Sequence, residues 1–190
     1  MCILKFKEQP INPANPDTIP KFIDQLIKPP TAISRVNKNY PGTYYEIKMM
    51  KAKHQFHRNF PYSDVWGYDG IVPGPTIEAK KDYTTYVKYL NKLPEKHFLP
   101  IDFSLHVANN SPEVRTVVHL HGANVDSASD GHPEAWYTKD YAATGPTFKR
   151  EVHAYTNHQP GTTMWYHDHS MGLTRLNVCA GLAGFYLLRD

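Results

Sequence analysis

Hydrophobic and polar residues alternate with a period of two in several short stretches after residue 43. The alternation is regular over residues 75–80 and 84–90, which is typical of strands with one buried face. Over residues 44–57 it is imperfect, and this indicates a long strand with a bulge or bend. β-branched and aromatic residues predict further strands at 116–121, 148–155, 163–171 and 180–188. About seven strands joined by turns and long connections predict an all-β antiparallel sandwich or barrel.

The first 42 residues have a different character, because prolines recur through them and disfavour regular strands and helices. We interpret residues 1–42 as an extended N-terminal arm that wraps the surface, and residues 43–190 as one domain. Within the arm, residues 21–27 have a short amphipathic pattern bounded by Pro20 and Pro29. This pattern predicts about two helical turns.

Glycines and prolines mark two connecting segments of the domain. Residues 66–75 are predicted to form a turn-dense hinge. Residues 122–146 form a long connection between strands, and a connection of this length in a compact domain is typical of a functional loop. It carries four acids, each of which could also be an ordinary solvated carboxylate: Asp126, Asp130, Glu134 and Asp140. One or two helical turns are predicted at residues 171–177.

Composition narrows the classes of partner. The chain has 16 prolines and 13 tyrosines, which favours β-structure with many turns over a helical bundle. The net charge of the chain is only +3, and the chain contains no block of lysines or arginines. We therefore expect no nucleic-acid partner. We also expect no membrane partner, because no apolar run approaches the ~20 residues that span a bilayer.

The N-terminus has neither the long apolar region nor the small-residue cleavage site of a secretion signal, so we expect cytoplasmic synthesis. The two cysteines, Cys2 and Cys179, lie far apart in the sequence and neither belongs to a Cys-x-x-Cys pair. Free thiols are therefore expected, which is consistent with an intracellular origin.

Two histidine pairs carry the candidate chemistry. His119 and His121 are two residues apart, and so are His167 and His169. On a strand, residues two apart point to the same face, so each extended segment would present two imidazoles on one side. Two such pairs facing each other would form a four-histidine pocket. Neutral imidazole without a cysteine partner suits copper, zinc, iron or nickel, and the alternative is two surface strands with incidental histidines.

Several segments of the chain resemble the multicopper oxidases, and in particular the bacterial spore-coat laccases, which are also described as bilirubin-oxidase-like. The histidine segments that resemble the family's first two copper motifs are His119-Leu120-His121-Gly122 and Trp165-Tyr166-His167-Asp168-His169. The segments that resemble the spore-coat branch are Trp66-Gly67-Tyr68, Pro73-Gly74-Pro75-Thr76, Ser129-Asp130-Gly131-His132-Pro133-Glu134-Ala135-Trp136 and Leu173-Thr174-Arg175-Leu176-Asn177-Val178. The resemblance extends over residues 44–190 and, more loosely, through the arm.

This resemblance implies a cupredoxin-like Greek-key β-barrel or sandwich, the first of three such domains in one enzyme. It also implies copper as the cofactor, with O₂ and a small-molecule reducing substrate such as a phenol as reactants. His119 would bind the type 2 copper, and His121, His167 and His169 the type 3 pair. Asp130 would assist proton delivery, and four protons per O₂ make such a carboxylate plausible. A place in the spore coat is also implied.

The chain departs from the complete family pattern. The four other cluster histidines and the His-Cys-His segment of the type 1 copper are absent from it. Cys179 does not replace that segment, because a type 1 site needs two histidines, a cysteine and a weak axial ligand. The type 1 site and the remaining ligands are therefore expected from other cupredoxin domains, in the same or a separate polypeptide.

Two alternatives stay open at this point. The chain could be a non-catalytic copper-binding or structural coat module. It could also be a zinc hydrolase that uses three of the four histidines and a water, with Asp130 or Glu134 as the base.

Overall fold

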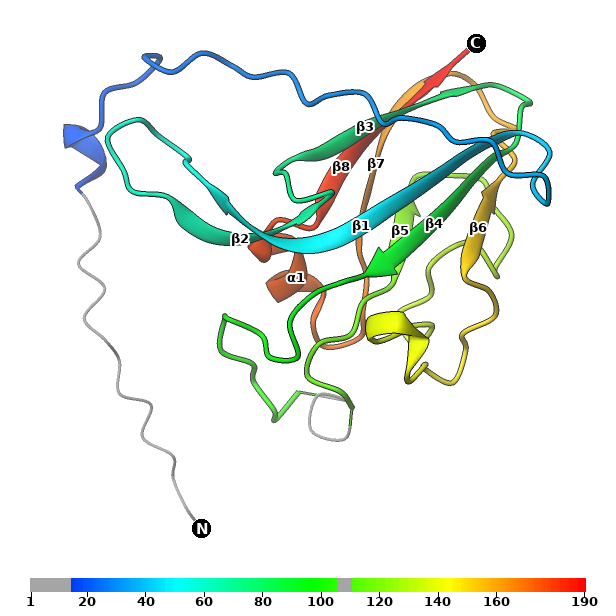
Figure 1. Cartoon of the computed structure of the whole chain (residues 1–190). Helices are drawn as coiled ribbons and strands as arrows, with labels where there is room; N and C mark the ends of the chain where they lie inside the picture. The colour runs from blue at the N-terminus through cyan, green and yellow to red at the C-terminus, as the bar shows by residue number, and fades with distance from the viewer. Residues whose placement is uncertain (1–14, 106–110) are drawn as a thin grey trace.

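Eight strands form two four-stranded sheets in the computed structural model, which describes residues 15–105 and 111–190. One sheet has the order β2-β1-β4-β6, from β1 (Thr43–His54), β2 (Ser63–Tyr68), β4 (Thr85–Asn91) and β6 (Val152–Tyr155). The other has the order β3-β8-β7-β5, from β3 (Gly74–Lys80), β5 (Val118–His121), β7 (Thr162–Asp168) and β8 (Ala183–Arg189). Figure 1 shows the sheets as two layers of a sandwich. The all-β prediction is confirmed.

The core between the layers is rich in tyrosine. In β4 the buried positions alternate with partly exposed ones, as the sequence pattern predicted. Side chains from both sheets meet in one cluster, whose buried tyrosines are Tyr45, Tyr68, Tyr89, Tyr137, Tyr155, Tyr166 and Tyr186. Burial of these rings supplies much of the apolar contact that holds the two layers together.

Both sheets are mixed, so the expectation of a purely antiparallel sandwich is wrong. β1 pairs with β4 in parallel, and β3 pairs with β8 in parallel. The other strand pairs are antiparallel. The parallel pairs arise because the chain changes sheets between these strands, and parallel neighbours require such crossover connections.

Residues 15–42 cross the molecule from one end to the other before the chain turns into β1 (Figure 1). Their only helix within the described residues is the short 3-10 helix η1 (Pro16–Thr18). The predicted helical turns at 21–27 are wrong. Phe22 has a left-handed φ of 61°, and Phe22, Leu26 and Ile27 are exposed. A segment this short is not stable as a helix in water without an apolar surface to pack on.

Other predicted boundaries shift by a few residues, and one strand was missed. β2 includes Trp66, Gly67 and Tyr68, which the sequence placed in a hinge. The predicted helical turns at 171–177 correspond to α1 (Thr174–Ala180), beside β2 and β7. The 122–146 connection contains the 3-10 helix η2 (Lys139–Tyr141).

Two other expectations concern Cys2 and the membrane. Cys2 lies outside the described residues. Within the described residues, no helix has the length and apolar character needed to cross a bilayer.

Two buried tyrosines provide a matched test of this core. The Tyr166 hydroxyl donates to the Pro75 carbonyl at 2.6 Å, whereas the Tyr68 hydroxyl has no hydrogen-bond partner among the described residues. Their rings lie 4.7 Å apart. We expect Tyr166→Phe to lower the free energy of unfolding by about 1–3 kcal/mol, because it leaves a buried carbonyl unpaired. Tyr68→Phe should be neutral or slightly stabilising. Denaturant unfolding measures both, and equal losses would contradict this assignment.

Candidate metal centre

The two histidine segments are neighbouring strands at one edge of a sheet. β5 is the edge strand and pairs with β7 in antiparallel register, with His119 directly opposite His167. The ladder continues past the end of β7, where the His169 N–H donates to the Val117 carbonyl at 2.8 Å. Backbone hydrogen bonds therefore fix the spacing of the four histidines, which rigid strands hold better than loops would.

The structure brings all four imidazoles together. Within the segments, the ring centroids of His119 and His121 lie 5.5 Å apart, and those of His167 and His169 lie 5.7 Å apart. Across the segments, the His119 ring lies 5.6 Å from that of His167 and 4.8 Å from that of His169. The His121 and His167 rings are 5.5 Å apart. The two pairs thus share one side of the sheet.

Hydrogen bonds set which ring nitrogen can bind a metal. Nδ1 of His119 lies against the Asp130 carbonyl, Nδ1 of His167 against the Asp168 carbonyl at 2.7 Å, and Nδ1 of His169 against the Gly131 carbonyl at 3.3 Å. A carbonyl oxygen only accepts, so each Nδ1 carries the proton and donates. Each Nε2 then carries the lone pair that can bind a metal ion, which is the usual arrangement of a metal-binding histidine.

His121 differs from the other three rings. Its Nδ1 lies 3.3 Å from Nε2 of His167. Two nitrogens bound to one metal ion at about 2.0–2.1 Å with tetrahedral angles lie about 3.3 Å apart. This pair of nitrogens therefore fits two ligands of a single ion. A donor set of four imidazoles is one that copper accepts.

The surroundings of His167 and His169 favour the neutral form of these two rings. Burial lowers the pKa of His167 to about 4, and the neighbouring imidazoles act in the same direction. Burial also lowers the pKa of His169, with a further contribution from His119. At neutral pH both rings are unprotonated and available as ligands.

The side chains do not form a three-ligand site by themselves. Within residues 15–105 and 111–190, no three histidine, cysteine, aspartate or glutamate side chains are placed to hold one metal ion. A catalytic zinc site of the common type needs three protein ligands on one ion. The described residues therefore do not supply the three ligands of such a site.

The four acidic side chains of the 122–146 connection lie in different environments. The Asp130 carboxylate lies 3.5 Å from His119 Nδ1 and is about half exposed. Asp126 instead pairs with Arg150, and Asp140 with Lys92. The Glu134 side chain forms no hydrogen bond or ion pair with the four histidines in the described part of the chain.

Three neighbouring side chains were not identified from the sequence as parts of the site, although they lie in segments that carry the resemblance. The Trp165 ring stacks on His167 at 4.0 Å and on His121 at 5.4 Å, which restricts both imidazoles. Asp168 and Asn177 are fully buried behind the histidines. Burial raises the pKa of Asp168 to about 6, against the effect of the hydrogen bonds that it accepts. The period of two could have located Asp168, because it places this residue on the face opposite His167 and His169.

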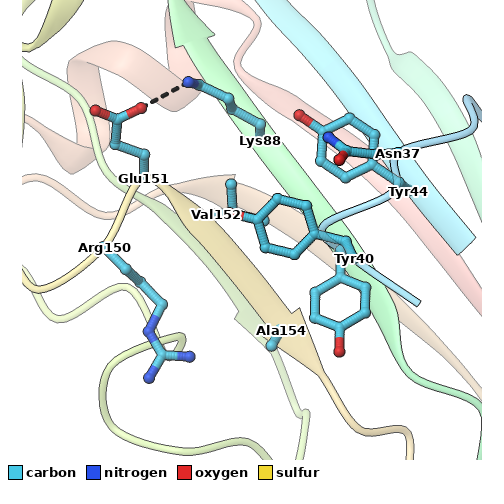
Figure 2. Close-up of a pocket in the computed structure, with 9 residues that line it drawn as sticks. Asn37, Tyr40, Tyr44, Lys88, Arg150, Glu151, Val152 and Ala154 are labelled. Carbon is cyan, nitrogen blue, oxygen red and sulfur yellow. Dashed lines mark hydrogen bonds and ion pairs between the residues drawn. The ribbon is translucent and has the colours of Figure 1, made fainter. Parts of the chain in front are cut away.

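The other sheet carries a hollow of about 450 Å³ on its surface, shown in Figure 2. Tyr40, Tyr44 and Tyr86 form its aromatic wall. Its charged groups are already paired: Lys88 Nζ lies 2.6 Å from Glu151, and Arg150 lies 3.4 Å from Asp126. His97 and His153 are buried and are not among the four clustered imidazoles, and His106 lies outside the described residues. The four-histidine cluster is therefore the candidate site, because its side chains suit metal binding.

Comparison with known proteins identifies relatives over most of the chain. The family model described as "Multicopper oxidase" matches residues 48–103 and 100–190. A laccase from Bacillus subtilis (strain 168) is 52% identical over 176 residues, which cover 91% of this chain and 34% of that protein. Multicopper oxidase LPR1 from Arabidopsis thaliana is 43% identical over 150 residues, covering 76% of this chain and 26% of that protein. The chain thus spans about a third of the length of these relatives.

Solved structures of the same class share the fold. A laccase from Pediococcus acidilactici Pa5930 superimposes with a TM-score of 0.66 at 24% identity, over 90% of this chain and 31% of that one. A multicopper oxidase from Campylobacter jejuni, described as a metallo-oxidase, gives a TM-score of 0.62 at 20% identity, over 86% of this chain and 29% of that one. The expected cupredoxin-like fold is confirmed.

Proposed function

Because this chain belongs to the multicopper oxidase family, we propose that it supplies half of the histidine ligands of an oxygen-reducing copper cluster. The complete enzyme would be of the laccase type, coupling one-electron oxidation of phenolic or similar substrates to four-electron reduction of O₂ to water. The observation that carries this proposal is the convergence of four imidazoles, three of which donate Nδ1–H to backbone carbonyls and so carry the metal-binding lone pair on Nε2.

The ligand assignment follows the family resemblance. His119 would bind the type 2 copper, and His121, His167 and His169 would bind the type 3 pair. The separation of 3.3 Å between His121 Nδ1 and His167 Nε2 supports a shared ion for these two rings. Copper cycles by one electron and accepts imidazole in both oxidation states, so a cluster of several ions can supply the electrons that O₂ needs.

Other domains must complete the centre. Residues 43–190 would form the first of three cupredoxin domains, with residues 1–42 as an arm on its surface. The remaining cluster ligands and the type 1 copper would come from the other domains. Cys179 is exposed on α1 and is not part of the histidine cluster, so it is not a type 1 ligand in this proposal. A place in the spore coat is proposed from the resemblance to that branch.

The test is to measure copper content and oxygen uptake in the complete enzyme that contains this chain. We expect copper at the stoichiometry of a full cluster plus a type 1 site, and phenol-dependent oxygen uptake that stops when a chelator removes the copper. Phenol oxidation that persists in the metal-free protein would refute the proposal. A fully copper-loaded protein that never consumes oxygen would instead support a non-catalytic copper-binding or structural coat module.

Asp130 provides a second test, because its carboxylate lies beside His119 and faces solvent. We propose that it delivers protons during oxygen reduction. General acid–base groups commonly contribute 10²–10⁴-fold, but water reaches a half-exposed site, so we expect Asp130→Asn to lower kcat by about 10- to 100-fold. Copper content should stay unchanged, since the His119 hydrogen bond goes to the backbone carbonyl of residue 130.

The matched control is Asp126→Asn, which removes a carboxylate of the same connection that pairs with Arg150. Steady-state oxygen uptake across pH compares the two variants. Equal kcat values for Asp130→Asn and the parent enzyme at every pH would remove Asp130 from the proton path.

A further inference from the structure

A cluster of buried polar groups lies directly behind the histidines. The side chain of Asp168 points to the face of β7 opposite His167 and is completely buried. Its two oxygens accept four hydrogen bonds: from the Val117 N–H at 3.0 Å, the Ser170 N–H at 3.1 Å, the Ser170 hydroxyl at 3.1 Å and the Asn177 side-chain amide at 2.9 Å. A buried carboxylate is tolerated only when it is satisfied in this way.

We propose that Asp168 is a positioning residue that holds both histidine segments in the geometry that metal binding needs. This inference rests on the proposed function, because it assigns a role toward the same copper cluster. Val117 lies two residues before His119, and Ser170 follows His169. One carboxylate therefore fixes the backbone immediately before the first pair and immediately after the second.

The backbone around Asp168 reinforces this connection. The Val117 N–H donates to Asp168, while the Val117 carbonyl accepts from the His169 N–H at 2.8 Å. The Ser170 hydroxyl also lies 3.3 Å from the Arg115 carbonyl, on the segment that leads into β5. Loss of the carboxylate would therefore loosen β5 and the end of β7 at the same point.

Asn177 extends the network to α1. Its side-chain amide donates to the Arg115 carbonyl at 3.1 Å as well as to Asp168. Its oxygen accepts from His97 Nε2 at 3.1 Å, because His97 Nδ1 is itself the acceptor for the Leu99 N–H. This chain of bonds ties the helix and the residue 97–99 loop to the carboxylate that supports the histidines.

The test is Asp168→Asn in the complete enzyme. The amide keeps the size of the side chain but replaces one acceptor with a donor that faces other donors. We expect copper affinity of the cluster, measured by competition with a chelator, to fall about 10- to 100-fold, as is typical when a residue supporting metal ligands is changed. In the copper-free protein, we expect hydrogen exchange of the Val117 and Ser170 amides to accelerate at least about tenfold.

The control is Val87→Ala, a core truncation in β4 on the other sheet, which lowers stability without touching the network. It should leave both the copper affinity and the two amides unchanged. The inference is overturned if Asp168→Asn binds copper within about twofold of the parent, or if both variants lose affinity equally.

A second variant covers the case in which Asp168→Asn does not accumulate. Ser170→Ala removes one of the four donors, and we expect it to weaken copper binding by about two- to tenfold. An unchanged affinity would overturn the inference. If the parent enzyme holds no copper at the four histidines, the proposed function fails, and the exchange of the Val117 and Ser170 amides still decides whether Asp168 fixes these segments.

Discussion

Replacing His167 with glutamine in the complete enzyme should deplete the cluster of copper and reduce oxygen uptake to background. His167 is the ring that contacts the most partners, since it lies opposite His119, beside Trp165 and within 3.3 Å of His121. Binding free energies of about 10–16 kcal/mol for four-ligand metal sites correspond to about 2.5–4 kcal/mol for each ligand. Losing one ligand should therefore weaken binding of the affected ion about 10²- to 10³-fold.

The matched control is His158→Gln, which makes the same substitution at an exposed histidine paired with Asp82. Copper analysis and oxygen uptake measure both variants at the same copper concentration. His158→Gln should behave as the parent enzyme does. If His167→Gln retains its copper and its rate, the assignment of this histidine as a ligand is wrong.

The site was predictable from the sequence to the extent that it depends on local periodicity. A spacing of two residues places His119 and His121 on one face of a strand, and the structure has them there. Which strands become neighbours is not a local property. The register that sets His119 against His167 depends on the whole sheet, and only the family resemblance suggested that the two pairs meet.

The supporting residues were less predictable, because their roles depend on contacts between distant segments. The period of two places Asp168 on the face of β7 opposite the histidines, but no local pattern pairs it with Asn177, nine residues later in the chain. The sequence places Trp165 in a strand and in a segment that resembles a copper motif, but its stacking on His121 comes from the β5–β7 pairing.

The errors in the predicted elements have the same origin, which is that contacts between distant segments decide the structure. Residues 63–68 form a strand although glycine and proline follow closely, because the Trp66 and Tyr68 side chains are buried in the core. Residues 21–27 carry a helical pattern, but this segment has no apolar surface to cover within the described structure, and Leu26 is exposed. Tertiary packing decided both outcomes against local propensity.

Gly131→Ala should have the largest structural effect of any single methyl added near the site. Gly131 has a left-handed φ of 77°, and an added Cβ would lie 2.1 Å from the Val118 carbonyl oxygen and 2.8 Å from the His119 Cα. The loop would have to move away from β5. That movement would take with it the carbonyls of Asp130 and Gly131, which accept from His119 and His169.

We expect Gly131→Ala to lower the local stability of β5 by about 2–5 kcal/mol, from the left-handed strain and the overpacking together. Copper affinity should fall about 10- to 100-fold, because two imidazoles lose the groups that orient them. Gly70→Ala is the matched control, since Gly70 has a φ of 74° and no atom within 4 Å of the added Cβ. It should lose only about 1–2 kcal/mol and no copper affinity. Hydrogen exchange of the β5 amides measures local stability, and competition with a chelator measures copper affinity, in both variants. Equal changes in Gly131→Ala and Gly70→Ala would mean that contact with β5 does not determine the position of the loop that contains Gly131.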